Sequence, residues 1–418
     1  MLDNVGFISF RIGGTDGVSL ETYKWAEIFE KFGLTSYYYG GELETPPSRS
    51  MVVPEAHFNY PAIKELYNMA YSHSQRPREL TDGLHKYREI LKESLYEFIK
   101  RFNIQLLVSE NALTIPLNLP LGMALTEVIA ETGLPVMAHH HDFFWERKRF
   151  LRNCVWDYFN SCYPPHLSNI QHIVINSSAQ NQLALRTGIS SMLIPNVMKF
   201  EEPPEPPDEY ASDVREALDI DKDELLILQP TRVVQRKGIE HAIELVARLG
   251  MKATLVISHA SGDEGYEYEE RVKEYAELLG IKAVFVSDII NDNRGRTPDG
   301  RKIYSLFDVY PHADLVTYPS IFEGFGNAFL EAIYFKKPLL VNNYSIYSFD
   351  IKPKGFKVIE FDNFISKETI RYARELLQDK EKIKKMGDHN YALGLRYYSY
   401  GVLESKINNV LTNILGRF

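Results

Sequence analysis

Residues 315–343 read LVTYPSIFEGFGNAFLEAIYFKKPLLVNN, and this stretch decides the fold. An apolar run typical of a buried strand leads into a turn that contains Gly324 and Gly326. A helical pattern over 327–335 follows, and then a second apolar run. Because glycine supplies the permissive backbone for a tight turn before a helix, the stretch predicts a strand, a helix and another strand. Such alternation indicates a parallel sheet with crossover helices.

The alternation extends over the whole chain. Strand candidates of the N-terminal half are 5–10, 36–41, 104–111, 134–142, 170–177 and 190–196. In the C-terminal half, strands begin LLILQP, KATLVISHA, KAVFVSD, ADLVTYPS and KPLLVNN, and helices are expected at 238–249, 264–279, near 303–310 and at 327–335. The predicted fold class is therefore α/β, with two doubly wound Rossmann-like domains that face an interdomain cleft.

A change of composition marks the domain boundary. KFEEPPEPPDEY, residues 199–210, carries prolines and acidic residues that resist both helix and central strand. We interpret it as a linker between an N-terminal domain, 1–198, and a C-terminal domain, 211–395. Residues 396–418 form a terminal segment with an amphipathic helical pattern.

Composition limits the function. The chain has 47 Lys and Arg against 56 Asp and Glu, a net charge of −9, which argues against a general nucleic-acid binder. Cys154 and Cys162 suit a reducing compartment and are expected to be packing residues. We see no signal peptide and no apolar run of the ~18 residues that a membrane span needs. The expected location is cytoplasmic.

Two glutamates bracket the glycine turn of the opening stretch. Glu323 is expected on the loop and Glu331 a turn or so into the helix. The first free N–H groups of that helix favour an anionic phosphate, and carboxylates accept hydrogen bonds from paired hydroxyls. The stretch therefore suits a nucleotide sugar. A loop–helix junction with an acidic cap and a solvated glutamate is the alternative that the stretch alone leaves open.

A basic turn strengthens the first interpretation. In TRVVQRKG (231–238), Arg232 ends a strand and Lys237 precedes the glycine that opens a helix. A guanidinium and an ammonium there can neutralise a diphosphate and stabilise it as a leaving group. Solvated loop charges are the alternative, and Arg236 is interpreted as such a surface charge.

Two more strand ends carry polar residues. ISFRIGGTDG lacks the dinucleotide-binding glycine spacing, so its turn is either structural or a place where the backbone approaches phosphate or sugar. In AHHHDFFWERKRF (138–150), neighbouring histidines point to opposite faces, and we see no cysteine or carboxylate cluster at metal spacing, so we exclude a zinc site. His141 is the favoured sugar contact, oriented by Asp142; buried, hydrogen-bonded histidines are the alternative. Arg147 and Arg149 either attract an anionic acceptor or belong to a solvated helix face.

Taken in order, these motifs resemble those of the GT-B glycosyltransferases, in particular the large retaining group that includes sucrose-phosphate synthase and bacterial mannosyltransferases. The motifs that carry the resemblance are GG (13–14), HHHD (139–142), IPN (194–196), TRVVQRKG (231–238) and PSIFEGFGNAFLEAI (319–333). The resemblance implies a nucleoside-diphosphate sugar held mainly by the C-terminal half and a hydroxyl acceptor held mainly by the N-terminal half. It also implies that the segment 396–418 crosses back to the first domain.

The resemblance assigns roles by position. It implies that Arg232 and Lys237 bind the diphosphate, Glu323 the donor sugar and Glu331 the ribose. The backbone of Gly324, Phe325 and Gly326 would approach donor phosphate or sugar, Gly14 would lie near the donor, and His141 would contact the transferred sugar.

The resemblance further implies transfer with retention, without a metal ion or other cofactor. GDP-mannose or a UDP-hexose is the expected donor. The sequence also resembles that of enzymes making mannosylglucosylglycerate, which would place Arg11, Arg147 and Arg149 against a small anionic acceptor such as glucosylglycerate. A nucleotide-sugar epimerase, a sugar phosphorylase and a non-catalytic sugar-nucleotide-binding subunit are the other functions that the motifs allow.

Overall fold

The computed structural model describes residues 2–14, 16–261, 265–291 and 293–416. It divides the chain into two compact units. Unit 1 consists of Met1–Asn196 and Leu403–Phe418, and unit 2 of Val197–Val402. Residues 199–210, the predicted linker, contain no helix or strand, and the chain ends at 417–418 lie outside the described residues.

Unit 1 is built on a seven-stranded parallel sheet with the order β5-β3-β1-β6-β7-β8-β9. The strands are β1 (Asn4–Ile8), β3 (Thr35–Gly40), β5 (Ser50–Val52), β6 (Leu106–Glu110), β7 (Val136–His140), β8 (Ile170–Val174) and β9 (Ser191–Leu193); β2 (Arg11–Ile12) pairs separately with β4 (Glu42–Leu43). The helices are α1 (Gly17–Lys31), α2 (Pro61–Ser72), α3 (Arg78–Arg101), α4 (Leu119–Thr132), α5 (Lys148–Leu151), α6 (Trp156–Cys162) and α7 (Ser177–Thr187). The strand order reverses between β1 and β6, which is where doubly wound sheets place ligands.

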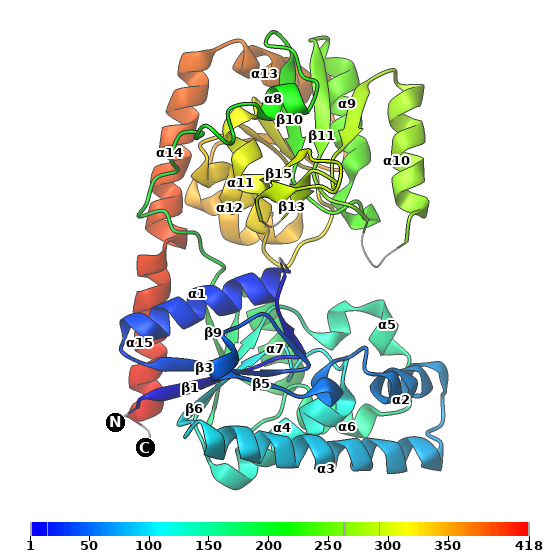
Figure 1. Ribbon diagram of the computed structural model, residues 1–418, viewed down its shortest axis with the longest axis vertical. Helices are drawn as coiled ribbons and strands as arrows, with labels where there is room; N and C mark the ends of the chain where they lie inside the picture. Colours follow the sequence, from blue (N-terminus) through cyan, green and yellow to red (C-terminus); the bar gives the residue numbers. More distant parts are fainter. Residues whose placement is uncertain (1, 15, 262–264, 292, 417–418) are drawn as a thin grey trace. The chain divides into compact units, whose positions relative to one another are not determined.

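Helices cover both faces of this sheet (Figure 1). On one face, α3 and α4 contribute to a core cluster that includes Leu95, Phe98 and Leu125. On the other face lies α1, whose Phe29 packs edge-on against Phe7 of β1. α1 begins where the Asp16 carboxylate accepts hydrogen bonds from the free N–H groups of its first turn, a standard helix cap.

Unit 2 has a six-stranded parallel sheet with the order β12-β11-β10-β16-β17-β18. The strands are β10 (Leu225–Gln229), β11 (Ala253–Ile257), β12 (Lys282–Phe285), β16 (Leu315–Tyr318), β17 (Leu339–Asn342) and β18 (Ile359–Phe361). The helices are α8 (Val214–Ala217), α9 (Ile239–Leu249), α10 (Glu267–Leu278), α11 (Leu306–Val309), α12 (Asn327–Tyr334), α13 (Lys367–Leu377) and α14 (Lys380–Tyr398). Its order reverses between β10 and β16. Both units are doubly wound α/β, as the sequence predicted.

One predicted helix begins later than expected. Where a helix was expected near 303–310, the chain forms strand β15 (Lys302–Ser305) and only then the single turn α11. β15 pairs with β13 (Ile290–Asn291) and β14 (Gly295–Arg296), so the cross-strand bonds of this small sheet override the local helical pattern. Arg294 joins the same sheet to Asp208 and Asp308 through ion pairs.

The last helix, α15 (Tyr400–Leu415), belongs to unit 1 from Leu403 onward. Its buried residues Leu403, Ile407, Val410 and Ile414 recur at helical spacing and form one apolar face. The Lys406 Nζ donates a hydrogen bond of 2.8 Å to the carbonyl oxygen of Leu193 in β9. The helix is therefore attached to the edge strand of the N-terminal sheet.

Candidate functional site

The loops that follow β10 and β16 meet at the carboxyl edge of the unit 2 sheet. Arg232 and Lys237 follow β10, and Glu323 follows β16. The two strands are neighbours and flank the reversal of strand order. The fold therefore brings together three predicted site residues that are separated by up to 91 positions in the sequence, at the point where such sheets bind ligands.

A buried carboxylate lies between two cations in this place. The Lys237 ammonium donates to the Oε1 of Glu323, and the Arg236 Nη1 donates to its Oε2 at 3.0 Å. Arg236 is further tied to the second loop, because its carbonyl oxygen accepts from the N–H of Ile321 at 2.8 Å. Arg232 is exposed beside this cluster. The interpretation of Arg236 as a surface charge was wrong: its side chain clamps the predicted sugar-binding glutamate.

Burial and pairing act against each other in the pKa values of the pair. Burial lowers the pKa of Lys237, and the charge of Glu323 opposes that change only in part. Burial alone would raise the pKa of Glu323, but Lys237 and Arg236 outweigh it, so the pKa lies below its usual value. Glu323 is therefore ionised at neutral pH and able to accept hydrogen bonds.

Glycines shape both loops. Gly238 has φ +58°, and a Cβ there would lie 2.7 Å from the Pro319 carbonyl oxygen, so the two loops touch through backbone. Gly326 has φ +122°, and its Cβ would lie 2.7 Å from the Tyr344 hydroxyl. Both positions need glycine for conformation and for space. α12 begins directly after Gly326, which directs its first N–H groups toward the loop.

Phe325 and Glu331 have different surroundings. The Phe325 ring is buried against Tyr398, and its carbonyl oxygen accepts from the Tyr344 hydroxyl at 2.9 Å, so a ligand can meet this residue only through backbone. Glu331 is half-buried on α12 and accepts from the Tyr310 hydroxyl at 2.7 Å. The Tyr310 hydroxyl therefore helps to orient the Glu331 carboxylate.

In unit 1, His141 contacts a carboxylate that the sequence reasoning missed. Glu110 ends β6, and its carboxylate lies 3.0 Å from the Nδ1 of His139 and 3.1 Å from the Nε2 of His141. Alternate residues of β7 share a face, so His139 and His141 both reach Glu110 while His140 points away. One ring nitrogen of His139, one of His141 and a carboxylate oxygen of Glu110 all lie within 4.8 Å of one another, close enough to hold a metal ion. We expected no carboxylate at metal spacing from these histidines, but Glu110 reaches them from the neighbouring strand although it lies 29 and 31 positions away in the sequence.

His140 forms a pair of its own. Its Nε2 lies 2.9 Å from the Nδ1 of His172 in β8. Among the described residues, the His140 Nδ1 and the His172 Nε2 are buried without a hydrogen-bond partner. Burial, and then the neighbouring imidazole, hold the pKa of His140 well below its usual value. Burial lowers the pKa of His172 to about 4.

The buried His140–His172 pair predicts that the folded protein is less stable in acid. Because both histidines have a lowered pKa in the folded state, the unfolded chain binds more protons below its own histidine pKa of about 6.5. We therefore expect the free energy of unfolding to fall as the pH drops from about 6.5 toward about 4. Urea denaturation across this range measures it. The double variant His140→Leu/His172→Leu should show a shallower slope, whereas His73→Gln, at an exposed position, should keep the wild-type slope. Equal slopes in all three proteins would contradict the prediction.

The glycine turn of unit 1 carries an internal carboxylate contact. Gly14 has φ +65°, and its N–H donates to the Glu44 Oε2 at 2.8 Å. Arg11 forms an ion pair of 3.2 Å with Asp16 at the start of α1. Thr15, within the same turn, lies outside the described residues. Gly14 lies in the loop that leads from β1 toward α1, beside the reversal of strand order in unit 1.

The basic residues after β7 differ in their attachments. The Arg147 Nε donates to the Asp142 Oδ2 at 2.9 Å, and the Asn111 amide donates to the other oxygen of Asp142 at 3.3 Å. Arg149 is exposed and lies over the Phe150 ring at 4.8 Å. Directly before Arg147, burial raises the pKa of Glu146 to about 7. Of the two arginines, Arg147 is tied to Asp142, whereas Arg149 lies over a buried ring.

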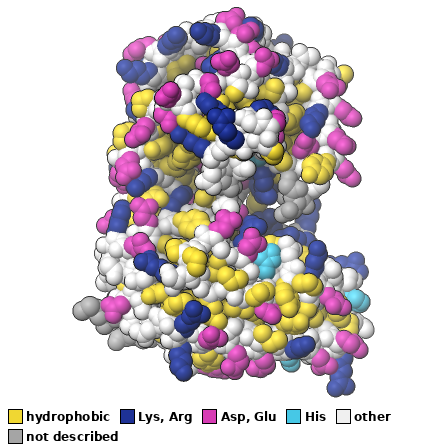
Figure 2. Space-filling view, viewed as in Figure 1, with side chains coloured by type: hydrophobic (Ala, Val, Ile, Leu, Met, Phe, Trp, Pro, Cys, Tyr) yellow, Lys and Arg dark blue, Asp and Glu magenta, His cyan; other side chains and the backbone are white. Residues whose placement is uncertain are grey.

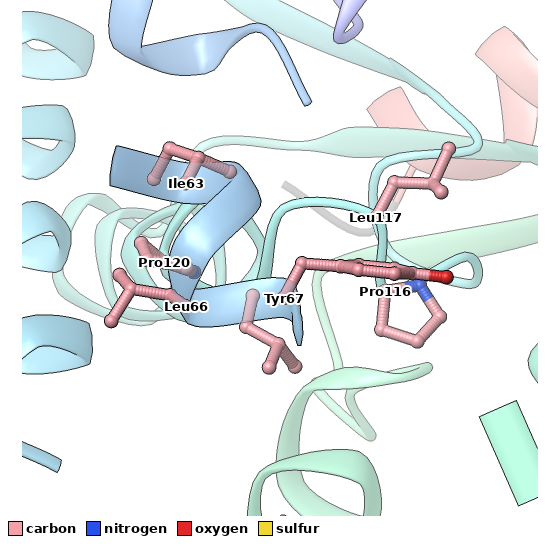
Figure 3. Close-up of a pocket in the computed structure, with 7 residues that line it drawn as sticks. Ile63, Leu66, Tyr67, Pro116, Leu117 and Pro120 are labelled. Carbon is pink, nitrogen blue, oxygen red and sulfur yellow. The ribbon is translucent and has the colours of Figure 1, made fainter. Parts of the chain in front are cut away.

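Other surfaces offer less chemistry. An apolar pocket in unit 1, with an empty volume of about 160 Å³, is lined by Ile63, Leu66, Tyr67, Pro116, Leu117, Leu119 and Pro120 (Figure 3). On the face drawn in Figure 2, Lys and Arg side chains are interspersed with Asp and Glu, which is not the pattern of a nucleic-acid-binding face. In the described part of the chain, no helix has the length and apolar character to span a membrane.

The chain resembles known proteins in sequence and in fold. Residues 211–392 match the family "Glycosyl transferases group 1". The chain is 33% identical to mannosylglucosylglycerate synthase of Petrotoga mobilis, over 91% of this chain and 92% of that protein. It is 31% identical to the enzyme of the same name from Thermotoga maritima, over 96% and 97%. The solved structure of sucrose-phosphate synthase from Thermosynechococcus elongatus has a similar fold, with a TM-score of 0.67 at 15% identity over 100% of both chains.

Proposed function

Because the chain belongs to the group 1 glycosyltransferases, we propose that it transfers a mannosyl group from GDP-mannose to a small anionic glycoside of the glucosylglycerate type. Transfer proceeds with retention at the anomeric carbon and without a metal ion. The observation that carries the proposal is the Lys237–Glu323–Arg236 cluster beside exposed Arg232, at the carboxyl edge of the unit 2 sheet. The name of the two relatives, mannosylglucosylglycerate synthase, contains the glucosylglycerate unit that we propose as the acceptor.

In the proposed donor site, the cations receive the diphosphate. Arg232 offers a planar fork of donors to phosphate oxygens, and Lys237 offers a point charge that offsets the negative charge developing on the leaving group. Glu323 accepts from sugar hydroxyls, and Glu331 from the ribose diol. The N–H groups at the start of α12, next to Gly324 and Gly326, add a favourable dipole for an anion.

The proposed transfer breaks the bond between the anomeric carbon and the diphosphate oxygen and forms a bond from that carbon to an acceptor hydroxyl oxygen. The hydroxyl proton passes to the departing phosphate oxygen, so a pair of opposed catalytic carboxylates is not needed. His141 contacts the sugar during transfer. The protein then contributes orientation and stabilisation of charge.

A product assay tests this proposal. We expect incubation with GDP-mannose and glucosylglycerate to yield, by mass spectrometry, an acceptor heavier by one hexose, at the same rate with and without EDTA. NMR of the product should show an α-linkage, as retention requires. Donor isomerised without acceptor product would favour an epimerase, and sugar phosphate formed with inorganic phosphate would favour a phosphorylase. Absence of any product with every GDP- or UDP-hexose tested would contradict the proposal.

The negative charge of the proposed acceptor predicts that arginine side chains contribute to acceptor binding. We propose that Arg149, with Arg147 and Arg11, binds the acceptor carboxylate. Arg149→Ala should raise the acceptor KM about 10-fold, in keeping with the loss of one charged hydrogen bond, and change kcat less than about 2-fold. Arg152→Ala, an exposed neighbour after α5, is the matched control and should keep the wild-type KM. With uncharged glucosylglycerol as acceptor, the Arg149→Ala effect should vanish; the same effect on both acceptors would contradict the assignment.

A further inference from the structure

Glu110 lies where a ligand-contacting histidine needs a partner. It ends β6, directly opposite His139 of β7 in the parallel register. Its side chain is fully buried. The exposed fraction of the side chain is 1% for His139 and 9% for His141. Of these three residues, His141 is therefore the one that a ligand can reach. Among the described residues, its Nε2 has Glu110 as partner, and no hydrogen bond is found at its Nδ1.

The surroundings of Glu110 hold this geometry in place. The Trp25 ring of α1 stacks on His139 with 4.4 Å between centroids, and the His139 ring lies 4.3 Å from that of His141. The His141 backbone N–H donates to the Asn111 Oδ1 at 2.8 Å. Both the ring and the backbone of His141 are thus attached to the end of β6. A ring held at Nε2 by a carboxylate presents its Nδ1 edge in one fixed direction.

The charges of this cluster are defined by groups from three elements. His141 faces Glu110 from β6, Glu21 from α1, and His139 and Asp142 from its own strand and the following loop; Lys24 pairs with Glu21 at 2.6 Å. Burial alone would raise the pKa of Glu110, but the two imidazoles lower it to about 2. Burial alone would lower the pKa of His141, but Glu110 outweighs it and raises that pKa above 6.5. The pair is therefore an ionised carboxylate beside an imidazole whose protonated form that carboxylate favours.

We propose that Glu110 is a positioning residue for the glycosyl transfer: it fixes the ring of His141 through Nε2, so that the Nδ1 edge of the ring meets a sugar in one orientation. The inference rests on the proposed function of His141 as a sugar contact. It follows the general logic in which a buried carboxylate orients a histidine and stabilises its protonated form. Glu110 itself does not touch substrate.

The conservative variant Glu110→Gln tests this role, because it keeps the volume and removes the charge. We expect kcat to fall about 10-fold to 100-fold with the donor KM within about 2-fold of wild type. His141→Gln should lose a similar factor, and the double variant should lose no more than the larger single effect, since both changes break one unit. Ser109→Ala, a buried neighbour on the same strand, is the matched control and should remain at the wild-type rate.

A second readout does not depend on activity. NMR titration of the His141 ring should give a pKa above 6.5 in the wild type and a lower one in Glu110→Gln. On the alkaline side of the pH profile, the activity of the variant should decline at a lower pH than that of the wild type. If Glu110→Gln does not fold, Glu110→Asp, which retains the charge, should fold and show an intermediate kcat. Should the wild type make no hexosyl product, the proposed function fails, but the titration still tests whether Glu110 holds His141.

Three outcomes would overturn the inference. One is a wild-type kcat in Glu110→Gln, and another is a His141 pKa that does not change in that variant. The third is loss of wild-type activity in EDTA with recovery on adding Zn²⁺ or Mn²⁺, which would make Glu110, His139 and His141 a metal-binding set instead.

Discussion

Replacing Lys237 by alanine is expected to reduce turnover at least ~100-fold, because in the proposed transfer the buried ammonium stabilises the charge of the departing diphosphate. The side chain is buried, and its Nζ lies 5.4 Å from the centre of the Tyr318 ring. Little water can therefore replace the lost charge. The measurement is kcat at saturating donor and acceptor.

Two variants control for indirect effects. Gln235→Ala changes an exposed residue of the same short turn, η4 (Gln235–Lys237), and should retain the wild-type kcat. Lys237→Arg keeps the charge but not the compact ammonium, and should recover only part of the rate. A wild-type rate in Lys237→Ala would show that this residue does not receive the leaving group.

The second large effect concerns Glu323. Glu323→Ala should also lower turnover at least ~100-fold, through loss of the proposed sugar contact. In addition, it leaves Lys237 buried without its carboxylate and beside Arg236, and breaking a buried ion pair in this way costs about 3–5 kcal/mol of unfolding free energy. Lys237→Ala should cost less, because Glu323 retains Arg236 at 3.0 Å.

Denaturation by urea measures this difference. Asp388→Ala is the matched control, since it breaks an exposed ion pair of 2.8 Å with Lys336 in the same unit and should cost no more than about 1 kcal/mol. Equal stability losses in Glu323→Ala and Asp388→Ala would contradict the picture of a buried, charge-coupled cluster.

Much of the fold follows from local pattern. The alternation of apolar runs and helical segments predicted both sheets, because strands of a parallel sheet are buried on both faces and read as continuous apolar runs. The helix expected near 303–310 begins only at Leu306, because cross-strand pairing holds the residues before it in β15, and such pairing depends on residues elsewhere in the chain.

The candidate site shows the same limit more sharply. Arg232, Lys237 and Glu323 could be named because each follows a strand at a recognisable turn. Arg236 and Glu110 could not, since their importance comes from partners 87 and 31 positions away. One signal was present in the sequence: Glu110 is a charged residue at the end of an apolar strand whose neighbour ends in histidines, and carboxyl ends of parallel strands meet at one edge.

The hydrogen bond between Gly14 and Glu44 has a consequence for how ligands enter unit 1. An oxygen that approaches the Gly14 N–H must first displace the carboxylate that already accepts from it. A ligand oxygen that binds at this turn replaces the Glu44 carboxylate as the acceptor of the Gly14 N–H. The affinity of such a ligand then depends on how much stronger its hydrogen bond is than the one to Glu44. Substituting Glu44 by glutamine would weaken the resident partner and so tighten the incoming one.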